Sequence, residues 1–174
     1  VIAEPTAALL SSNIDMNKGG KYMVVDFGGS TEDNSIADIS DGMIDILSTN
    51  GNVYLGGYDI DNALAKWVVE DFKNENGIDL SKDSMAYSRI LEAVEKAKIE
   101  LSNSTTTEIN LPYITVKDNT PIHLIKTVTK AKFEQLIDGE VSKIINLGKE
   151  AIRKAGISVN DLDGILLVGG STRI

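Results

Sequence analysis

The sequence contains no cysteine, a single histidine and three prolines among its 174 residues. Without cysteine the chain can form neither a disulfide nor a thiolate metal site, which fits a reducing compartment such as the cytoplasm. His123 is the one histidine, so no set of imidazole ligands can be assembled, and its alternating polar and apolar surroundings predict an exposed strand residue. No apolar run approaches the roughly 18 residues of a membrane span, and no signal peptide is visible.

Basic residues are fewer than acidic ones. The chain has seventeen Lys and Arg and twenty-six Asp and Glu, which gives a formal charge of −9. A field of that sign disfavours binding to nucleic acids and anionic membranes. A nucleotide would therefore need local backbone donors and a cation to offset the repulsion. The hydrophobic content of 42% is ordinary for a globular protein, and the length allows one large domain or two small subdomains.

Two glycine-rich segments, Gly28–Thr31 and Gly169–Arg173, each follow an apolar strand. Because glycine has no Cβ, paired glycines let backbone N–H groups come close to an anion. Their order and separation predict a phosphate held by the first segment and a nucleoside by the second. The structural alternatives are a plain hairpin turn and a plain strand-to-helix turn.

The residues beside these glycines carry the predicted chemistry. Asp26 and Asp33 bracket the first loop with oxygen ligands that suit Mg²⁺ held partly through water. The loop lacks the Gly-Lys-Ser/Thr ending of a P-loop and does not fit the dinucleotide pattern. Ser171 follows the second pair at the expected start of a helix, where anions bind, and the Arg173 guanidinium can stack on a base.

The hydrophobic pattern predicts strands followed by helices, then strands, a helix and a strand. Strands are expected over 22–25, 35–39, 44–49, 108–116, 122–128 and 165–168, and helices over 4–10, 59–76, 83–101 and 129–156. Asp59 is expected to cap the second helix. This order indicates an α/β or α+β fold with a subdomain inserted between about Gly56 and Val128. Glu95, Lys98 and Ser102 share one helix stripe, which is either the rim of a cleft or a solvated face.

Taken together, these pieces resemble the nucleotide-binding domain of the DnaK-type, seventy-kilodalton heat-shock chaperones. The resemblance runs along essentially the whole chain, in ordered motifs at family spacing. Its motifs are Glu4–Ala8, Asp26–Asp33, Leu55–Asp59, Glu95–Ser102, Asn110–Ile114 and Leu166–Arg173.

The resemblance implies an α/β, actin-like (ribonuclease H-like) ATPase fold, of which this chain would be the second lobe. It implies an inter-lobe helix and loop over 1–16, an inner subdomain over 17–55 and 129–174, and an outer subdomain over 56–128. Because Val1 already reads as structure and Ile174 follows a strand and turn, we expect an excised fragment. The first lobe, with its catalytic lysine, is expected upstream, so the fragment alone should not hydrolyse ATP usefully.

By the same resemblance, ATP or ADP with Mg²⁺ is the cofactor. Glu4 and Asp26 would act on Mg²⁺ through waters, with Thr31 near the attacking water. The other nucleotide contacts implied are Gly28, Gly29, Ser30, Gly56, Gly57, Glu95, Lys98, Ser102, Gly169, Gly170, Ser171 and Arg173.

The chain departs from the family at four places: Ala3 for asparagine, Ser30 for a third glycine, Glu32 for phenylalanine and Tyr58 for an acidic residue. If position 30 needs a positive φ, Ser30 is strained by about 1 kcal/mol or more. Glu32 is expected to add negative charge close to the polyphosphate. These departures predict weakened nucleotide affinity or turnover.

For the full-length protein, the resemblance implies ATP hydrolysis coupled to binding and release of unfolded peptides through a domain absent here. The implied partners are a nucleotide-exchange factor and a J-domain co-chaperone, in the cytoplasm. The alternative is a divergent, nucleotide-insensitive lobe that binds such an exchange factor or another partner. A sugar kinase or filament protein of the actin-like superfamily fits less well, because the Glu95–Ser102 helix and the Glu4–Ala8 motif argue against it.

Overall fold

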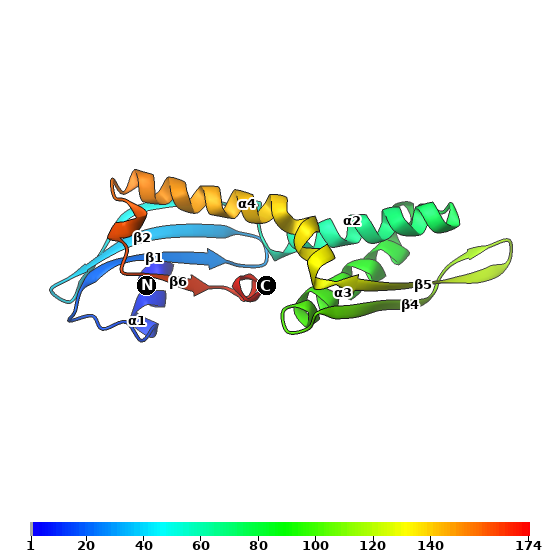
Figure 1. The fold of residues 1–174 in the computed structure, drawn as a ribbon, viewed down its shortest axis with the longest axis horizontal. Helices are drawn as coiled ribbons and strands as arrows, with labels where there is room; N and C mark the ends of the chain where they lie inside the picture. Colours follow the sequence, from blue (N-terminus) through cyan, green and yellow to red (C-terminus); the bar gives the residue numbers. More distant parts are fainter. Residues whose placement is uncertain (1) are drawn as a thin grey trace. The chain divides into compact units, whose positions relative to one another are not determined.

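The computed structural model describes residues 2–174, so Val1, from which the expectation of an excised fragment was drawn, lies outside the described residues (Figure 1). The chain divides into two compact units. The first combines the chain up to Gly57 with Glu140–Arg173, and the second combines Tyr58–Gly139 with Ile174.

The first unit is built on a four-stranded sheet in the order β3-β2-β1-β6. Its elements are α1 (Glu4–Ser11), β1 (Gly20–Phe27), β2 (Glu32–Ser40), β3 (Met43–Asn52), the later part of α4 (Lys130–Lys154), the 3₁₀ turn η2 (Val159–Asp161), β6 (Gly164–Val168) and the 3₁₀ turn η3 (Gly170–Arg173). The first three strands form an antiparallel meander, because tight turns join them. β6 pairs parallel to β1 after α4 has crossed over, so β1 and β6 end at the same edge.

Helices cover both faces of this sheet, and each encloses its own hydrophobic cluster (Figure 1). On one face, Met23 and Ile36 pack with Ala151 and Ile152 of α4. On the other face, Leu9 of α1 packs with Val24 and Ala37. Successive strand residues alternate between the two clusters, as the pleat requires.

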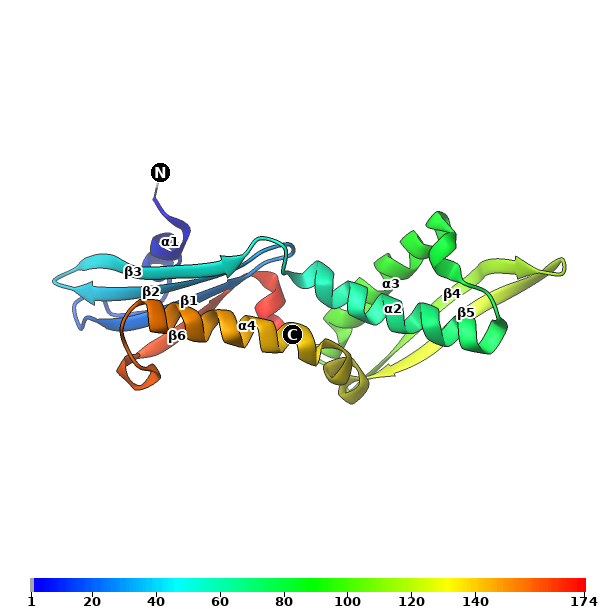
Figure 2. The same ribbon diagram turned by 90° about the horizontal axis from the view of Figure 1, so that it is seen from above.

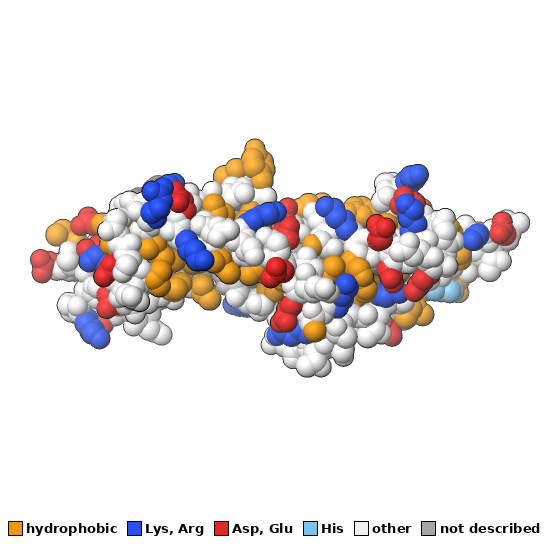
Figure 3. Space-filling view, turned by 45° about the horizontal axis from the view of Figure 1, so that its top comes forward, with side chains coloured by type: hydrophobic (Ala, Val, Ile, Leu, Met, Phe, Trp, Pro, Cys, Tyr) orange, Lys and Arg blue, Asp and Glu red, His pale blue; other side chains and the backbone are white. Residues whose placement is uncertain are grey.

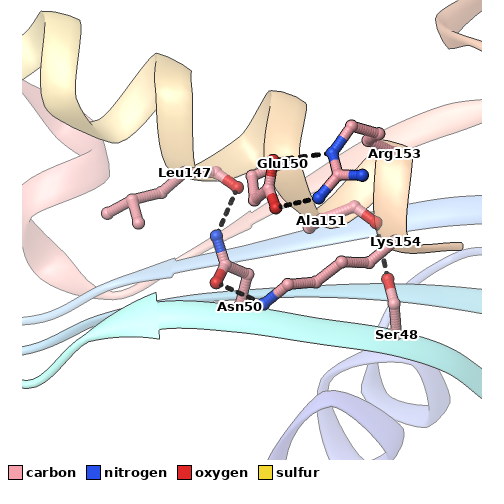
Figure 4. A network of polar contacts seen from close by, with 7 residues as sticks. All are labelled: Ser48, Asn50, Leu147, Glu150, Ala151, Arg153 and Lys154. Atoms are coloured by element: carbon pink, nitrogen blue, oxygen red, sulfur yellow. Dashed lines mark hydrogen bonds and ion pairs between the residues drawn. The ribbon is translucent and has the colours of Figure 1, made fainter.

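Polar contacts attach α4 to the edge strand β3 (Figure 4). The Asn50 amide donates to the carbonyl of Leu147 at 3.0 Å and accepts from the Lys154 ammonium at 2.9 Å. The Ser48 hydroxyl donates to the carbonyl of Ala151 at 2.6 Å. These bonds fix α4 over the half of the sheet that lies nearer to residues 28–31, the loop between β1 and β2.

The second unit packs two helices against a two-stranded sheet (Figure 2). Its elements are α2 (Gly57–Asn76), η1 (Leu80–Lys82), α3 (Ser84–Leu101), β4 (Thr106–Lys117), β5 (Thr120–Thr129) and α4 through residue 139. Asp83 caps α3 by accepting from the amides of Met85 and Ala86, each at 3.0 Å. The buried apolar core is Ile60, Leu64, Val68, Phe72, Ile90, Val94, Ala97, Leu101, Ile109, Leu124 and Val128.

Every helix and strand expected from the sequence is present, but three details were wrong. α2 begins at Gly57, two residues before its predicted cap, so Asp59 lies within the first turn. The helical turn η3 begins at Gly170, so Ser171 lies inside it and does not precede it as a cap. β2 begins at Glu32 and not at Ser35, because pairing with β1 extends to Phe27 opposite Glu32.

Acidic and basic side chains are interspersed over the face seen in Figure 3. Among residues 2–174, no helix combines the length and apolar character that crossing a membrane requires.

Candidate functional site

Three glycine-bearing segments of the first unit meet at the carbonyl oxygen of Gly28. The Gly57 amide donates to this oxygen at 3.0 Å, and the Ser171 hydroxyl donates to it at 2.8 Å. The Gly28 amide in turn closes its own loop on the carbonyl of Thr31 at 2.9 Å. The two segments singled out in the sequence therefore lie together, with a third, Gly56–Gly57, bonded to the same residue.

Two of these glycines are required by the packing of the chain itself. A Cβ on Gly56 would lie 2.4 Å from the carbonyl oxygen of Gly29, and one on Gly169 would lie 2.3 Å from that of Phe27. Real Cβ atoms are not found that close to backbone. Gly169 also has a φ of +88°, which favours glycine. These two residues let three backbone segments touch.

Gly28 and Gly29 are different, because the fold itself does not demand glycine there. Neither has a positive φ. A Cβ on Gly28 would meet nothing closer than 3.6 Å, and one on Gly29 would meet nothing within 4 Å. The space over Gly29 is therefore open, which is what close approach of a ligand to the backbone requires.

The loop also offers amide donors. Gly29 and Ser30 are exposed, and their N–H groups donate no hydrogen bond to any residue within 2–174. Successive backbone N–H groups that are left without a partner in a turn are able to bind an anion. The loop can therefore receive a phosphate without breaking bonds of its own.

The condition attached to Ser30 is not met, and the expectation about Glu32 was wrong. Ser30 does not adopt a positive φ, so it carries none of the conditional strain. Glu32 does not present a charge on the loop surface, because it is the first residue of β2 and is 0% exposed. Its side chain lies on the sheet face shared with Phe27, its partner on β1. The Glu32 side chain therefore lies in the interior of the first unit and not on the surface of the loop.

An acidic group lies on the opposite face of the same strands. Asp26 and Asp33 are direct partners across β1 and β2, and Glu4 begins α1. All three line a hollow of about 530 Å³ between α1 and the sheet. Repulsion from Asp26 and a hydrogen bond with its carboxyl raise the pKa of Glu4, with smaller contributions from burial and from Asp33. The carboxyl of Glu4 thus takes up a proton more readily than an isolated glutamate does.

This arrangement fits a hydrated Mg²⁺ better than a directly ligated one. Among residues 2–174, no three carboxylates or imidazoles are close enough together to hold a metal ion. Carboxylate oxygens around an open hollow are instead the donors that Mg²⁺ meets through its retained waters. Glu4 and Asp26 can hold the ion in that way.

The predicted stripe on α3 lies in the second unit. Glu95 is exposed, Ser102 is the C-cap of the helix, and its hydroxyl donates to the carbonyl of Lys98 at 3.2 Å. The Lys98 ammonium, 9% exposed, donates to Asp61 Oδ2 at 2.8 Å. Asp61 is 7% exposed, and burial is the main cause that raises its pKa, against the lowering effect of Lys98.

Asp61 is a residue that the sequence analysis missed. It lies 37 positions before Lys98, on another helix, and its neighbours in the sequence give no sign of its partner. The remaining residues assigned to the adenosine, Gly169 to Ser171 and Arg173, lie in the first unit. Arg173 is exposed and makes no hydrogen bond or ion pair with the described residues.

Comparison with known families agrees with this fold. The sequence model of the Hsp70 protein family matches residues 1–174, which is the whole chain. The mixed α/β architecture is that of part of an actin-like ATPase domain, the nucleotide-binding part of these chaperones. The chain therefore belongs to the Hsp70 family.

Proposed function

We propose that this chain is the second lobe of the ATP-binding domain of a DnaK-type chaperone and forms one wall of its adenine nucleotide cleft. The observation that supports this most is the loop at Gly28–Thr31. Its amides at Gly29 and Ser30 are exposed and unused within the described residues, and the space over Gly29 is open. Hsp70-family domains in general bind ATP or ADP with Mg²⁺, which gives these donors a ligand.

In this proposal each group has a defined task. The amides of Gly29 and Ser30 bind the β- and γ-phosphates, and the Thr31 hydroxyl lies near the attacking water. Glu4 and Asp26 hold Mg²⁺ through water, and the ion neutralises phosphate charge when bound. Gly56 and Ser171 act indirectly, since they fix the loop through its backbone. Glu95, Lys98 and Ser102 contact the nucleoside.

The full-length protein would couple ATP hydrolysis to the binding and release of unfolded peptides, in the cytoplasm, with an exchange factor and a J-domain protein as partners. Phosphoryl transfer requires charge neutralisation from both sides of the nucleotide. We therefore expect this chain alone to bind nucleotide weakly and to show no useful ATPase activity.

Gly29→Val tests the phosphate-binding role of the loop. Because nothing lies within 4 Å of the added Cβ and φ is not positive, the free energy of unfolding should change by no more than about 0.5 kcal/mol. The side chain would fill the space that the phosphates need, so affinity for Mg·ADP should fall about tenfold or more, which is about 1.4 kcal/mol. Calorimetric titration and thermal unfolding measure the two effects.

Gly139→Val is the matched control, because Gly139 is also exposed, lacks a positive φ and has open space around it. It should leave affinity unchanged. Equal affinity of Gly29→Val and the native chain would contradict the proposal. Absence of Mg·ADP binding in the native chain, with recovery in Ser30→Gly/Glu32→Phe, would favour the alternative of a nucleotide-insensitive lobe.

A further inference from the structure

Asp61 and Lys98 form a buried ion pair that joins α2 to α3. The Lys98 ammonium donates to Asp61 Oδ2 at 2.8 Å, and the side chains are 11% and 10% exposed. Asp61 lies in α2, and Lys98 lies in the last turn of α3. Lys98 is one of the nucleoside contacts proposed above, whereas Asp61 has no role in that site.

The helix positions on either side of this pair are apolar. Leu64, three residues after Asp61 on α2, is fully buried, and so is Val94, four residues before Lys98 on α3. Residues three and four apart share one face of a helix, so the pair interrupts two apolar stripes. Leucine and methionine at the two positions would continue these stripes.

The pair is an unfavourable way to fill this space. Asp61 Oδ1 is buried and has no hydrogen-bond partner among the described residues. An unsatisfied buried oxygen costs free energy, and the desolvation of an ion pair is offset only when its remaining atoms are also bonded. Apolar residues of similar volume are often as stable or more stable. Folding alone therefore does not account for the pair.

The pair does provide an ammonium group in a fixed place. A lysine has a flexible four-carbon stem, and its charged end turns toward water unless a partner holds it. The bond to Asp61 holds the end of Lys98 against α2, while 11% of its side chain stays exposed. The exposed part is what a ligand can reach.

The charge of Glu95 also reaches this pair. Burial, above all, raises the pKa of Asp61, the bond and the charge of Lys98 lower it, and the charge of Glu95 adds to the raising. Glu95 is exposed and lies three residues before Lys98 on α3. Asp61 therefore interacts electrostatically with two of the proposed nucleoside contacts.

We propose that Asp61 is a positioning residue of the nucleoside site and acts by fixing the Lys98 ammonium before the nucleotide binds. This inference rests on the proposed function, in which Lys98 contacts the nucleoside. Asp61 itself does not touch the ligand. With the carboxylate in place, binding does not have to order the lysine side chain, and without it each binding event does.

Asp61→Asn tests the proposal, because it keeps the size of the side chain and removes its charge. In calorimetric titration of the native 174-residue chain and the variant, affinity for Mg·ADP should fall about tenfold in the variant. Net charge cannot cause such a loss, since removing a negative charge from a chain of −9 favours an anion. Affinity for Mg·pyrophosphate, which has no nucleoside, should change by less than about twofold.

Two further variants bracket this result. Asp61→Leu/Lys98→Met removes the ammonium and fills its space with apolar groups, so it should stay folded and lose at least as much Mg·ADP affinity as Asp61→Asn. Lys73→Met is the matched control, because it removes an exposed α2 ammonium that pairs with Asp79 at 3.4 Å. It should bind both ligands like the native chain. Equal weakening of both ligands in Asp61→Asn would overturn the positioning role.

A second measurement needs no nucleotide. Burial and a bond to a carboxylate slow the exchange of ammonium protons with water, so a ¹H–¹⁵N spectrum of the lysine side chains should contain a signal that is absent in Asp61→Leu/Lys98→Met. In Asp61→Asn the exchange of these protons should accelerate about tenfold or more. Lys73→Met should keep the native signal.

The two measurements separate this inference from the proposed function. Equal Mg·ADP affinity of the native chain and Asp61→Leu/Lys98→Met would contradict the nucleoside contact of Lys98, whatever the spectra show. A Lys98 signal that is unchanged in Asp61→Asn would contradict the positioning role of Asp61, whatever the affinities are.

Discussion

Replacing Gly169 with alanine is expected to lower the free energy of unfolding by about 3 kcal/mol. The added Cβ would lie 2.3 Å from the Phe27 carbonyl oxygen and 2.9 Å from Asp26 Oδ1, so β6 and β1 would have to separate at the edge where the loop begins. Such overpacking costs about 1 to 3 kcal/mol. A φ of +88° adds about 1 to 2 kcal/mol for a residue with a side chain. Chemical denaturation measures the loss.

Gly170→Ala is the control for this substitution. The neighbouring glycine has no positive φ, and a Cβ on it would meet nothing within 4 Å. Its alanine variant should remain within about 0.5 kcal/mol of the native chain. Similar stabilities for the two variants would show that β1 and β6 do not approach each other as described.

Asp61→Ala is expected to cost about 3 to 5 kcal/mol, because it removes the carboxylate that pairs with the buried Lys98 ammonium. The two side chains are 10% and 11% exposed and their charged atoms are 2.8 Å apart. Lys98→Met should cost a similar amount, since Asp61 would keep a buried charge or take up a proton. Thermal and chemical unfolding of both variants provide the measurement.

The double variant Asp61→Leu/Lys98→Met separates pairing from packing. Replacing a buried ion pair with apolar residues of similar size is often neutral or stabilising. The double variant should therefore recover most of the stability lost in the single variants. Additive losses in the double variant would mean that the two residues do not form a pair.

Much of the fold could be predicted from local patterns. The helical spacing of Ile60, Leu64 and Phe72, and the apolar run at 165–168, each specify an element that the structure contains. The ends of the elements were harder to predict where pairing between strands outweighs the β-propensity of the local sequence. The polar residues at 32–34 gave no strand signal, yet they form part of β2 because their backbone pairs with β1.

The candidate site could be predicted in outline, because paired glycines after strands have a specific physical use. The sequence could not say which glycines serve the fold and which leave room for a ligand. Gly56 and Gly169 are fixed by close backbone approach, whereas Gly29 faces open space. That distinction depends on contacts between segments far apart in the sequence.

Two side chains could not be placed from sequence at all. Asp61 and Glu32 are charged by type, and the usual expectation for such residues is exposure. Their burial depends on partners brought by the tertiary fold, Lys98 for Asp61 and Asn34 for Glu32. Glu32 was expected to place a charge near the phosphates. Its side chain is instead buried, on the opposite face of the sheet from Asp33.

The central claim is that the amides of Gly29 and Ser30 receive the phosphates of an adenine nucleotide. Amide chemical shifts of the chain, followed during titration with Mg·ADP and separately with adenosine, test it most directly. We expect saturable shifts at residues 28–31 with Mg·ADP, no such shifts with adenosine, and none in either titration at residues 118–119, the turn between β4 and β5. Loop amides that stay unchanged while Mg·ADP shifts other residues, or that respond equally to adenosine, would contradict it.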